Sequence, residues 1–265
     1  MPIDTTPVDS LIDTHAHLDM PEFEKDLPQV IERAQGGGVT TIIIVGTDPA
    51  SCTRTIEIAE RYPHIFAILG VHPHNVAEVQ DGDLEQLHRL AQHAKVRAWG
   101  EIGLDFFRNL SPQSIQKERF RQQIAIAKAL KLPVVIHSRA ATEETIACLE
   151  EEKASEIGGV IHCFSGDQGA AKRYLQMGFV LSIPGVITFP KNQILRDVVK
   201  GLPQDGFIVE TDCPFLTPAP HRGKRNEPAY VRLTAEAVAR VRGETIEKIA
   251  SQTTANACRV FNITV

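Results

Sequence analysis

Residues 11–17 read LIDTHAH: two aliphatic residues open the stretch, and His15 and His17 end it, two positions apart. Side chains two residues apart on a strand lie on the same side. An open nucleotide-binding sheet would carry a glycine-rich turn directly after its first strand, and none follows here. The stretch therefore predicts a strand that presents two imidazoles together at its carboxyl end, in a fold other than an open nucleotide-binding sheet.

The same pattern, a short apolar run followed by a helix-like segment, recurs along the 265 residues. Near-continuous apolar runs are typical of parallel strands that are covered on both faces. The expected strands are 11–17, 40–46, 65–72, 98–104, 132–137, 159–164, 179–183 and 206–211. Such units in a chain of this length predict an α/β fold, a single-domain TIM-type (β/α)8 barrel over residues 1–265, closed by helices in 228–263.

Composition narrows the class of protein. Apolar residues make up 43% of the chain and charged residues 23%, as in a soluble globular protein rather than a disordered one. The net charge of −5 argues against a broad basic surface for duplex nucleic acid. The first ten residues lack the basic start and apolar run of a secretory signal, and the five cysteines are scattered. We expect a cytoplasmic protein with no membrane association and no obligate protein partner.

The residues with ligand chemistry fall at the ends of predicted strands. Carboxyl ends of barrel strands open on one face, where active sites of this fold lie. A single histidine at a strand end is more often structural, but the joint pattern across five strands favours a metal site. The predicted ligands are His15, His17, Glu101, His137, His162 and Asp212.

Six ligands exceed the need of one open catalytic site, and a carboxylate can bridge two ions. Glu101, midway along the chain, is the natural bridge. Imidazoles and carboxylates suit Zn²⁺ or Mn²⁺, and carboxylates with water also permit Mg²⁺. The sequence thus predicts two divalent metal ions (Mg²⁺, Mn²⁺ or Zn²⁺).

Other candidates are less defined. His72 and His74 also share one side; ligation, phosphate contact and loop structure all remain open for them. Cys163 and Cys213 each follow a proposed ligand directly, so we expect both thiols to point the opposite way and to pack. Asp105 could face the site without an assigned role.

Ordered motifs resemble the TatD family of metal-dependent deoxyribonucleases within the amidohydrolase-like barrels. The resemblance covers nearly the whole chain. The matching segments are 12–19 (IDTHAHLD), 70–74 (GVHPH), 100–105 (GEIGLD), 137–139 (HSR), 162–166 (HCFSG), 210–214 (ETDCP) and 220–228 (PHRGKRNEP).

This resemblance implies a TIM-type barrel, a divalent-metal site and hydrolysis of phosphodiester bonds in DNA, in some members as a 3′→5′ exonuclease on single-stranded DNA or RNA. It further implies how the ligands divide. One ion would be held by His15, His17, Glu101 and Asp212, and the second by Glu101, His137 and His162.

Several residues are assigned roles in this phosphodiesterase hypothesis. Asp212 is the expected proton acceptor and Glu101 the bridge. Arg139 follows His137 by two residues, and Arg222 and Arg225 follow the last strand, so phosphate could find charge-assisted donors there. Glu210 and Asp13 are expected to orient the ligands from behind.

Two other functions stay open. The same barrel could hydrolyse a small amide, lactone or organophosphate. Many such enzymes bridge their metals with a carboxylated lysine on strand four, whereas this chain has Glu101, and the nearest preceding lysine is Lys95. A barrel that binds metal only for stability is the third option, but structural sites are usually closed and rich in cysteine.

Overall fold

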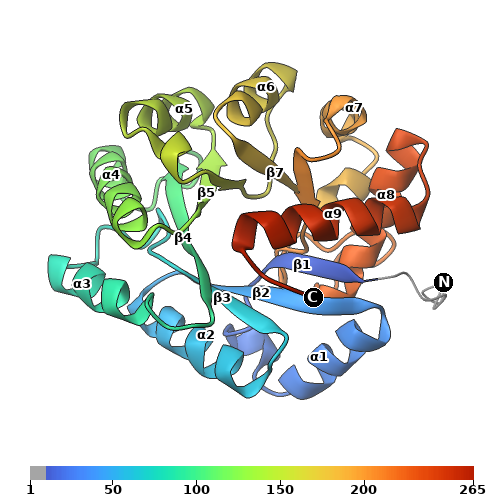
Figure 1. Ribbon diagram of the computed structural model, residues 1–265, viewed down its shortest axis with the longest axis horizontal. Coiled ribbons are helices and arrows are strands. Elements are labelled where there is room, and N and C mark those ends of the chain that lie inside the picture. Colours follow the sequence, from blue (N-terminus) through green and yellow to red (C-terminus); the bar gives the residue numbers. More distant parts are fainter. Residues whose placement is uncertain (1–9) are drawn as a thin grey trace.

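The expected apolar segments form one parallel sheet in the computed structural model, which describes residues 10–265. Neighbours in sequence are neighbours in the sheet, and helices surround it (Figure 1). The strands are β1 (Leu11–Ala16), β2 (Val39–Gly46), β3 (Ile65–Leu69), β4 (Val96–Asp105), β5 (Val134–Arg139), β6 (Gly159–Ile161), β7 (Phe179–Ile183) and β8 (Phe207–Val209). The predicted TIM-type barrel is confirmed.

The α-helices lie in the connections between strands and after β8. They are α1 (Leu27–Gly36), α2 (Pro49–Arg61), α3 (Asp81–Leu90), α4 (Gln113–Leu130), α5 (Thr142–Glu151), α6 (Gln168–Gln176), α7 (Gln193–Gly201), α8 (Val231–Arg242) and α9 (Ile246–Phe261). Short 3₁₀ turns are η1 (Pro21–Phe23), η2 (Ala154–Glu156), η3 (Gly185–Thr188) and η4 (Pro228–Tyr230). No helix within residues 10–265 is both long and apolar enough to cross a bilayer.

Polar contacts, rather than a regular ladder, join β1 to β8. An isolated bridge joins Ala16, the last residue of β1, to Cys213, which lies beyond the end of β8. The Thr14 hydroxyl donates to the Val209 carbonyl at 2.9 Å, and the Asp212 amide donates to the His15 carbonyl at 2.9 Å. The barrel is therefore nearly closed, and its seam runs directly beneath the predicted ligands.

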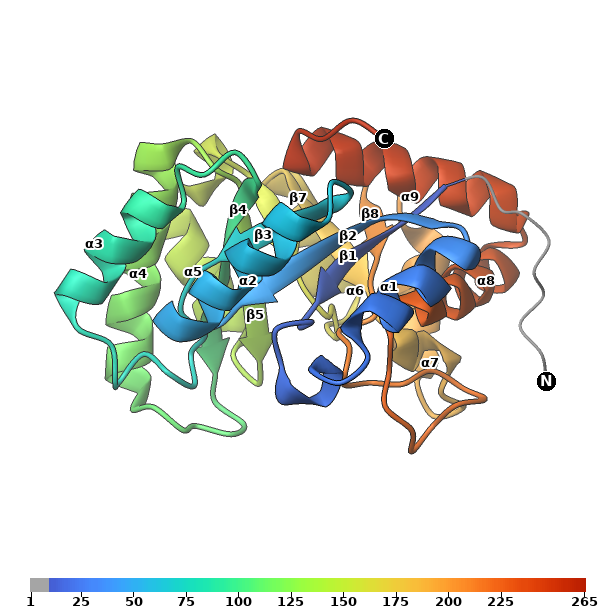
Figure 2. The same cartoon turned by 90° about the horizontal axis from the view of Figure 1, so that it is seen from below.

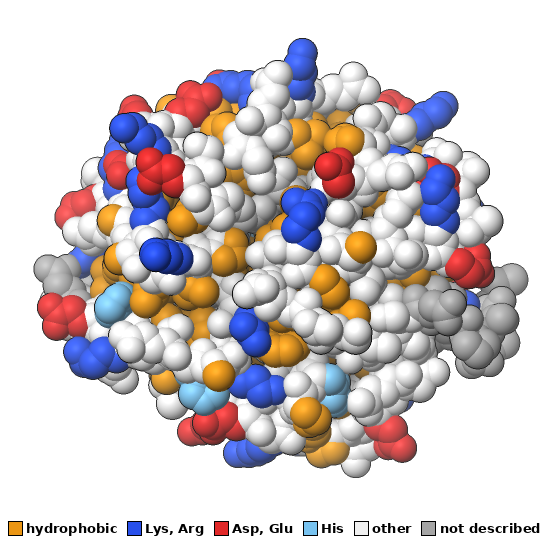
Figure 3. All heavy atoms as spheres, viewed as in Figure 1, with side chains coloured by type: hydrophobic (Ala, Val, Ile, Leu, Met, Phe, Trp, Pro, Cys, Tyr) orange, Lys and Arg blue, Asp and Glu red, His pale blue; other side chains and the backbone are white. Residues whose placement is uncertain are grey.

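The amino-terminal end of the barrel is apolar and covered. Figure 2 shows α9 lying across this end, with the loops that follow the strands at the opposite end. Ala257 and Phe261 of α9, with Ile263 beyond it, pack on interior residues of the strands such as Ile12 and Ile208. On the face that α9 crosses, charged side chains of both signs are interspersed (Figure 3).

Several strands end earlier than predicted. β1 ends at Ala16, β3 at Leu69, β6 at Ile161 and β8 at Val209, so the predicted ends were one to three residues too long. Positive φ angles at Cys163 (46°) and Asp212 (57°) show the backbone turning away after β6 and β8. The amino-terminal residues 1–9, which entered the expectation of no secretory signal, lie outside the described residues.

Candidate metal centre

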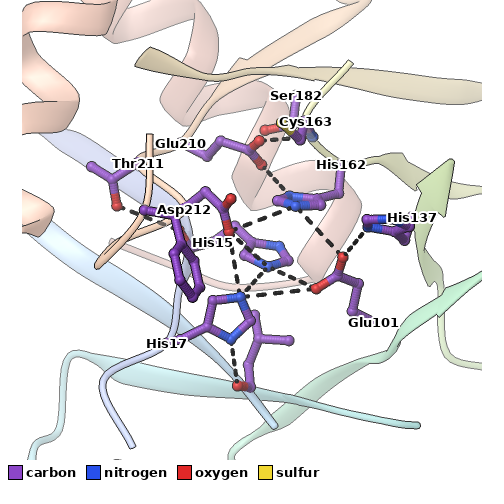
Figure 4. Close-up of polar contacts among 12 residues, drawn as sticks. His15, His17, Glu101, His137, His162, Cys163, Ser182, Glu210, Thr211 and Asp212 are labelled. Carbon is purple, nitrogen blue, oxygen red and sulfur yellow. Dashed lines mark hydrogen bonds and ion pairs between the residues drawn. The ribbon is translucent and has the colours of Figure 1, made fainter. Parts of the chain in front are cut away.

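The carboxyl end of the barrel gathers the side chains that were predicted as ligands. They come from β1 and the residue after it, from β4 and β5, and from the loops after β6 and β8. Even the most exposed of them, His137, has only 16% of its side chain exposed. The structure brings all six together (Figure 4): His15, His17, Glu101, His137, His162 and Asp212.

Simple alternation delivers the histidines on two of the strands. Val135 of β5 belongs to the apolar interior of the barrel, and His137 follows it by two residues. Val160 of β6 and His162 have the same relation. Because strand side chains alternate between faces, both histidines continue an interior row.

Glu101 faces the interior of the barrel because the ladder between β4 and β5 is interrupted beside it. Ala98 faces the interior, so regular alternation would turn Glu101, three residues later, outwards. The ladder between β4 and β5 instead shifts register between Gly100 and Ile102, on either side of Glu101. The shift reverses the alternation, so that Glu101 faces inwards and Ile102 packs in the outer core.

The ladder between β1 and β2 also has a register shift next to a proposed ligand. Ile12 faces the interior, and the register shifts between Asp13 and Ala16. His15 therefore faces the interior despite its odd separation from Ile12. Ring atom Nε2 of His15 lies 3.3 Å from Nε2 of His17.

Four atoms that could bind a metal ion, two nitrogens and two oxygens, face one another on the side of the cluster where His15 and His17 lie. His17 Nε2 lies 3.3 Å from Asp212 Oδ1, and His15 Nε2 lies 3.3 Å from Glu101 Oε2. His17 Nδ1 lies 3.2 Å from the carbonyl oxygen of Val45, which can only accept, so the ring proton belongs on Nδ1. The lone pair on Nε2 is then directed at the cluster, as a metal ligand requires.

The second oxygen of Glu101 faces a different set of histidines. Glu101 Oε1 lies 2.7 Å from His137 Nδ1, 3.4 Å from His72 Nε2 and 3.6 Å from His162 Nε2. His72, Glu101 and His137 have the spacing of a possible metal-binding group. Sequence reasoning ranked His72 below the six ligands, although its spacing from His74 was the available signal.

Asp105 holds two of these imidazoles. Its Oδ2 lies 3.1 Å from His137 Nε2 and 2.9 Å from His74 Nε2. The other carboxylate oxygen accepts the amides of Phe107 (3.0 Å) and Arg108 (2.7 Å). Asp105 is fully buried and shares the side of β4 that Glu101 faces, so this residue, to which the sequence assigned no role, orients His137.

Glu210 supports the cluster from the β8 side. Its Oε2 lies 2.9 Å from His162 Nδ1, which leaves Nε2 of that ring for the cluster, and its Oε1 accepts the Cys163 amide at 2.7 Å. The expectation for Cys163 was wrong: its thiol, a His162 nitrogen and an Asp212 oxygen all lie within 4.8 Å of one another. The positive φ of Cys163 breaks the alternation on which that expectation rested. Cys213 is buried in the core, as expected.

Asp13 lies beneath the cluster, in the seam between β1 and β8. Its carboxyl group accepts the Thr211 amide at 2.9 Å and pairs with the Thr211 hydroxyl at 2.6 Å. Burial raises the pKa of Asp13 to about 8, although the hydrogen bonds to Thr211 oppose this shift. The group ties the two strands together directly below His15 and Asp212.

The charges of the cluster are those of a cation site. Burial alone would raise the pKa of Glu101, but His162 and His72 outweigh burial and hold that pKa well below its usual range. Burial lowers the pKa of His162, yet Glu210 and Glu101 raise it to about 10. Within residues 10–265, every ion pair of Glu101 and Asp212 is with a histidine. A divalent cation can take the place of the protons that these imidazoles hold in its absence. The set of nitrogen and carboxylate ligands therefore fits such a cation.

The three predicted phosphate-binding arginines lie in different settings. Arg139 stacks over the Phe107 ring, with 4.2 Å from Cζ to the ring centroid, and Arg222 stacks over Phe189 at 4.3 Å. Both side chains are exposed. Arg225 instead donates to both Asp26 oxygens, at 2.7 and 2.8 Å, so its charge is already neutralised.

Comparison with known proteins gives consistent matches. Residues 12–262 match the family described as TatD related DNase. An uncharacterized metal-dependent hydrolase of Bacillus subtilis is 47% identical, over 96% of this chain and 99% of that protein. The 3′-5′ ssDNA/RNA exonuclease TatD of Pectobacterium atrosepticum is 36% identical, over 96% and 100%. The crystal structure of a TatD homologue from Escherichia coli has a TM-score of 0.91 at 33% identity, over 96% and 98%.

Proposed function

The chain belongs to the TatD-related DNase family and is a metal-dependent hydrolase, and from this premise we propose that it hydrolyses phosphodiester bonds of single-stranded DNA or RNA from the 3′ end. The similarity to an exonuclease that bears this name supports the substrate. We further propose that the protein acts in the cytoplasm, since all five cysteines are unpaired.

One observation carries the proposal: the two oxygens of Glu101 face two different sets of imidazoles. This arrangement supports two divalent cations, Mg²⁺, Mn²⁺ or Zn²⁺, with Glu101 between them. Such ions would acidify a water molecule and neutralise charge on the phosphate and the leaving oxygen. His15, His17 and Asp212 would hold the first ion, and His137 and His162, with His72 beside them, the second.

The remaining chemistry belongs to the side chains. Burial alone would raise the pKa of Asp212, but the hydrogen bond with His17 and the charge of His162 outweigh burial and hold that pKa below its usual value. The carboxylate is therefore ionised and can accept the proton of the attacking water. Arg139 and Arg222, both exposed, supply donors to the substrate phosphates. His74, a quarter exposed, reaches the rim beside Asp105.

The amide or lactone hydrolase alternative is weakened by the position of Lys95. Its Nζ donates to the carbonyls of Tyr62, Pro63 and Ile65 at the amino-terminal end of β3, far from a bridging position beside Glu101. A carboxylate bridge and exposed arginines suit a phosphodiester better than a neutral amide.

A matrix of metals and substrates tests the proposal. Chelator-treated protein receives Mg²⁺, Mn²⁺ or Zn²⁺ and is offered 5′-labelled single-stranded DNA, duplex DNA, RNA, a lactone and an amide. We expect no cleavage without metal and stepwise shortening of single strands with it. Intact nucleic acid together with a hydrolysed lactone or amide would favour the alternative, and tight metal binding without hydrolysis would favour a structural site.

A further inference from the structure

Two phenylalanines are exposed at the carboxyl end of the barrel. The chain has eleven phenylalanines, and within residues 10–265 only Phe107 (65%) and Phe215 (46%) are largely exposed. Both lie in segments next to proposed ligands: Phe107 follows β4, which carries Glu101, and Phe215 lies in the loop after β8 that carries Asp212. Large aromatic side chains that stay exposed indicate a binding surface when they gather around a site.

Phe107 is held in place by the cluster itself. Its amide donates to Asp105 Oδ1 at 3.0 Å, and the other oxygen of Asp105 contacts His137. The guanidinium of Arg139 covers one face of the ring at 4.2 Å. Because the side chain remains 65% exposed, the rest of the ring is open to solvent.

Phe215 is anchored in the same manner at the other end of the cluster. Its amide donates to the Asp212 carbonyl at 2.9 Å, and the buried Asn226 side chain donates to the Phe215 carbonyl at 2.6 Å. The ring lies 6.1 Å from the His17 ring, between centroids. A rigid backbone beneath an exposed ring lowers the entropic cost of binding.

We propose that Phe107 and Phe215 are stacking platforms for two unpaired bases, one on each side of the phosphodiester that is cut. Phe107 adjoins the His137 end of the cluster and Phe215 the His17 end. Glu101 pairs with both His137 and His17, so a phosphate seated over Glu101 would lie between the two rings. Arg139 supplies positive charge beside one platform. This inference rests on the proposed function and names what would select its substrate.

The platforms favour single strands for a physical reason. Base stacking on an aromatic side chain contributes roughly 1–3 kcal/mol and tolerates any base, because every base has a π face. Bases inside a duplex already stack on their neighbours and would have to be unpaired first. Phe107 and Phe215 thus account for strand selection without base-specific hydrogen bonds.

Kinetics on oligonucleotides that lack single bases test the proposal. Phe107→Leu and Phe215→Leu keep an apolar side chain but remove the ring, whereas Phe107→Trp and Phe215→Trp keep a ring. Phe66→Leu is the matched control, since Phe66 also lies under an arginine (Arg97, 5.0 Å) but at the amino-terminal start of β3. Each variant is first checked by thermal unfolding. Each is then assayed on single-stranded DNA with or without an abasic nucleotide on either side of the terminal phosphodiester.

We expect each leucine variant to raise KM about tenfold on intact DNA, and the tryptophan variants and Phe66→Leu to stay near the wild-type value. This increase in KM should vanish on the oligonucleotide that lacks the base stacked by the substituted residue, and the position of that base should differ between the two variants. An unchanged KM in the leucine variants, or an equal increase in KM on abasic DNA, would refute the stacking role of the two phenylalanines but leave the proposed nuclease activity intact. Absence of any nucleic-acid cleavage by the wild-type protein would overturn both.

Discussion

The two ends of the barrel are built from the same strands but filled by opposite chemistry. At the amino-terminal end, Phe261 and its neighbours on α9 plug an aliphatic interior. At the carboxyl end, the same strands finish in buried histidines and carboxylates. A hollow of about 790 Å³, lined by residues such as Thr40 and Phe66, lies at the amino-terminal end, away from the cluster. A hollow therefore does not by itself mark the active end, but convergent ligand atoms do.

The difference indicates a division of labour. Burial of apolar surface at one end stabilises the barrel, and that stability offsets the cost of burying charged and polar groups at the other. Substitutions at the two ends should therefore change different measurements: metal content and activity at one end, the free energy of unfolding at the other.

The largest effect is expected for Glu101→Gln. The amide keeps the shape of the side chain but removes the charge that two sets of imidazoles share. Activity on single-stranded DNA should fall roughly a thousandfold, and bound metal, measured by elemental analysis, should fall with it. Far-UV circular dichroism should stay unchanged, because the packing of α9 lies at the other end. Full activity with full metal content would refute Glu101 as the shared ligand.

Phe261→Ala tests the apolar end. The side chain is 1% exposed, so its loss leaves a cavity and should lower the free energy of unfolding by about 3–5 kcal/mol in urea titrations. Specific activity of the folded fraction should remain that of the wild type. Val265→Ala, an exposed position near the same end, serves as the control. If Phe261→Ala lost activity without losing stability, the two ends would be coupled and the comparison would fail.

Much of this arrangement followed from the sequence. Aliphatic runs at regular intervals predicted the barrel, and regular alternation suffices to aim His137 and His162 inwards. The inward turn of Glu101 depends on a register shift, and alternation along a single strand contains no information about its ladder with β5. The sequence did not predict the roles of Asp105 and His72, because these depend on contacts with His137 and Glu101, which lie far away in sequence. The pairing of Arg225 with Asp26 likewise joins residues that are distant in the chain.

A smaller effect is expected where the two chemistries meet, at Asp13. The pKa of this carboxyl group is about 8 in the folded protein and 3.8 in a free side chain, so between these pH values the native state holds one proton more than the unfolded state. The contribution of Asp13 to stability is therefore complete below pH 3.8 and is lost as pH rises towards 8. The slope is at most about 1.4 kcal/mol per pH unit.

Asp13→Asn removes this titration and retains an acceptor for the Thr211 amide. Urea titrations of chelator-treated protein at pH 6 and 7 should show a flatter pH dependence in the variant than in the wild type. Parallel curves would mean that the Asp13 carboxyl group is ionised in the fold, and that charge extends deeper into the barrel than the cluster.

The smallest effects should separate two arginines of one loop and so define the edge of the active end. Arg222 is exposed and stacked on Phe189, whereas both Asp26 oxygens already accept hydrogen bonds from Arg225. Arg222→Ala should raise KM for single-stranded DNA roughly threefold and reduce the slope of log KM against log salt by about 0.7, the value for one phosphate contact. Arg225→Ala should leave that slope unchanged, because its charge is not available to the substrate. Equal changes in both variants would show that the loop acts through its net charge, and the active end would then include the Asp26 side of the rim as well.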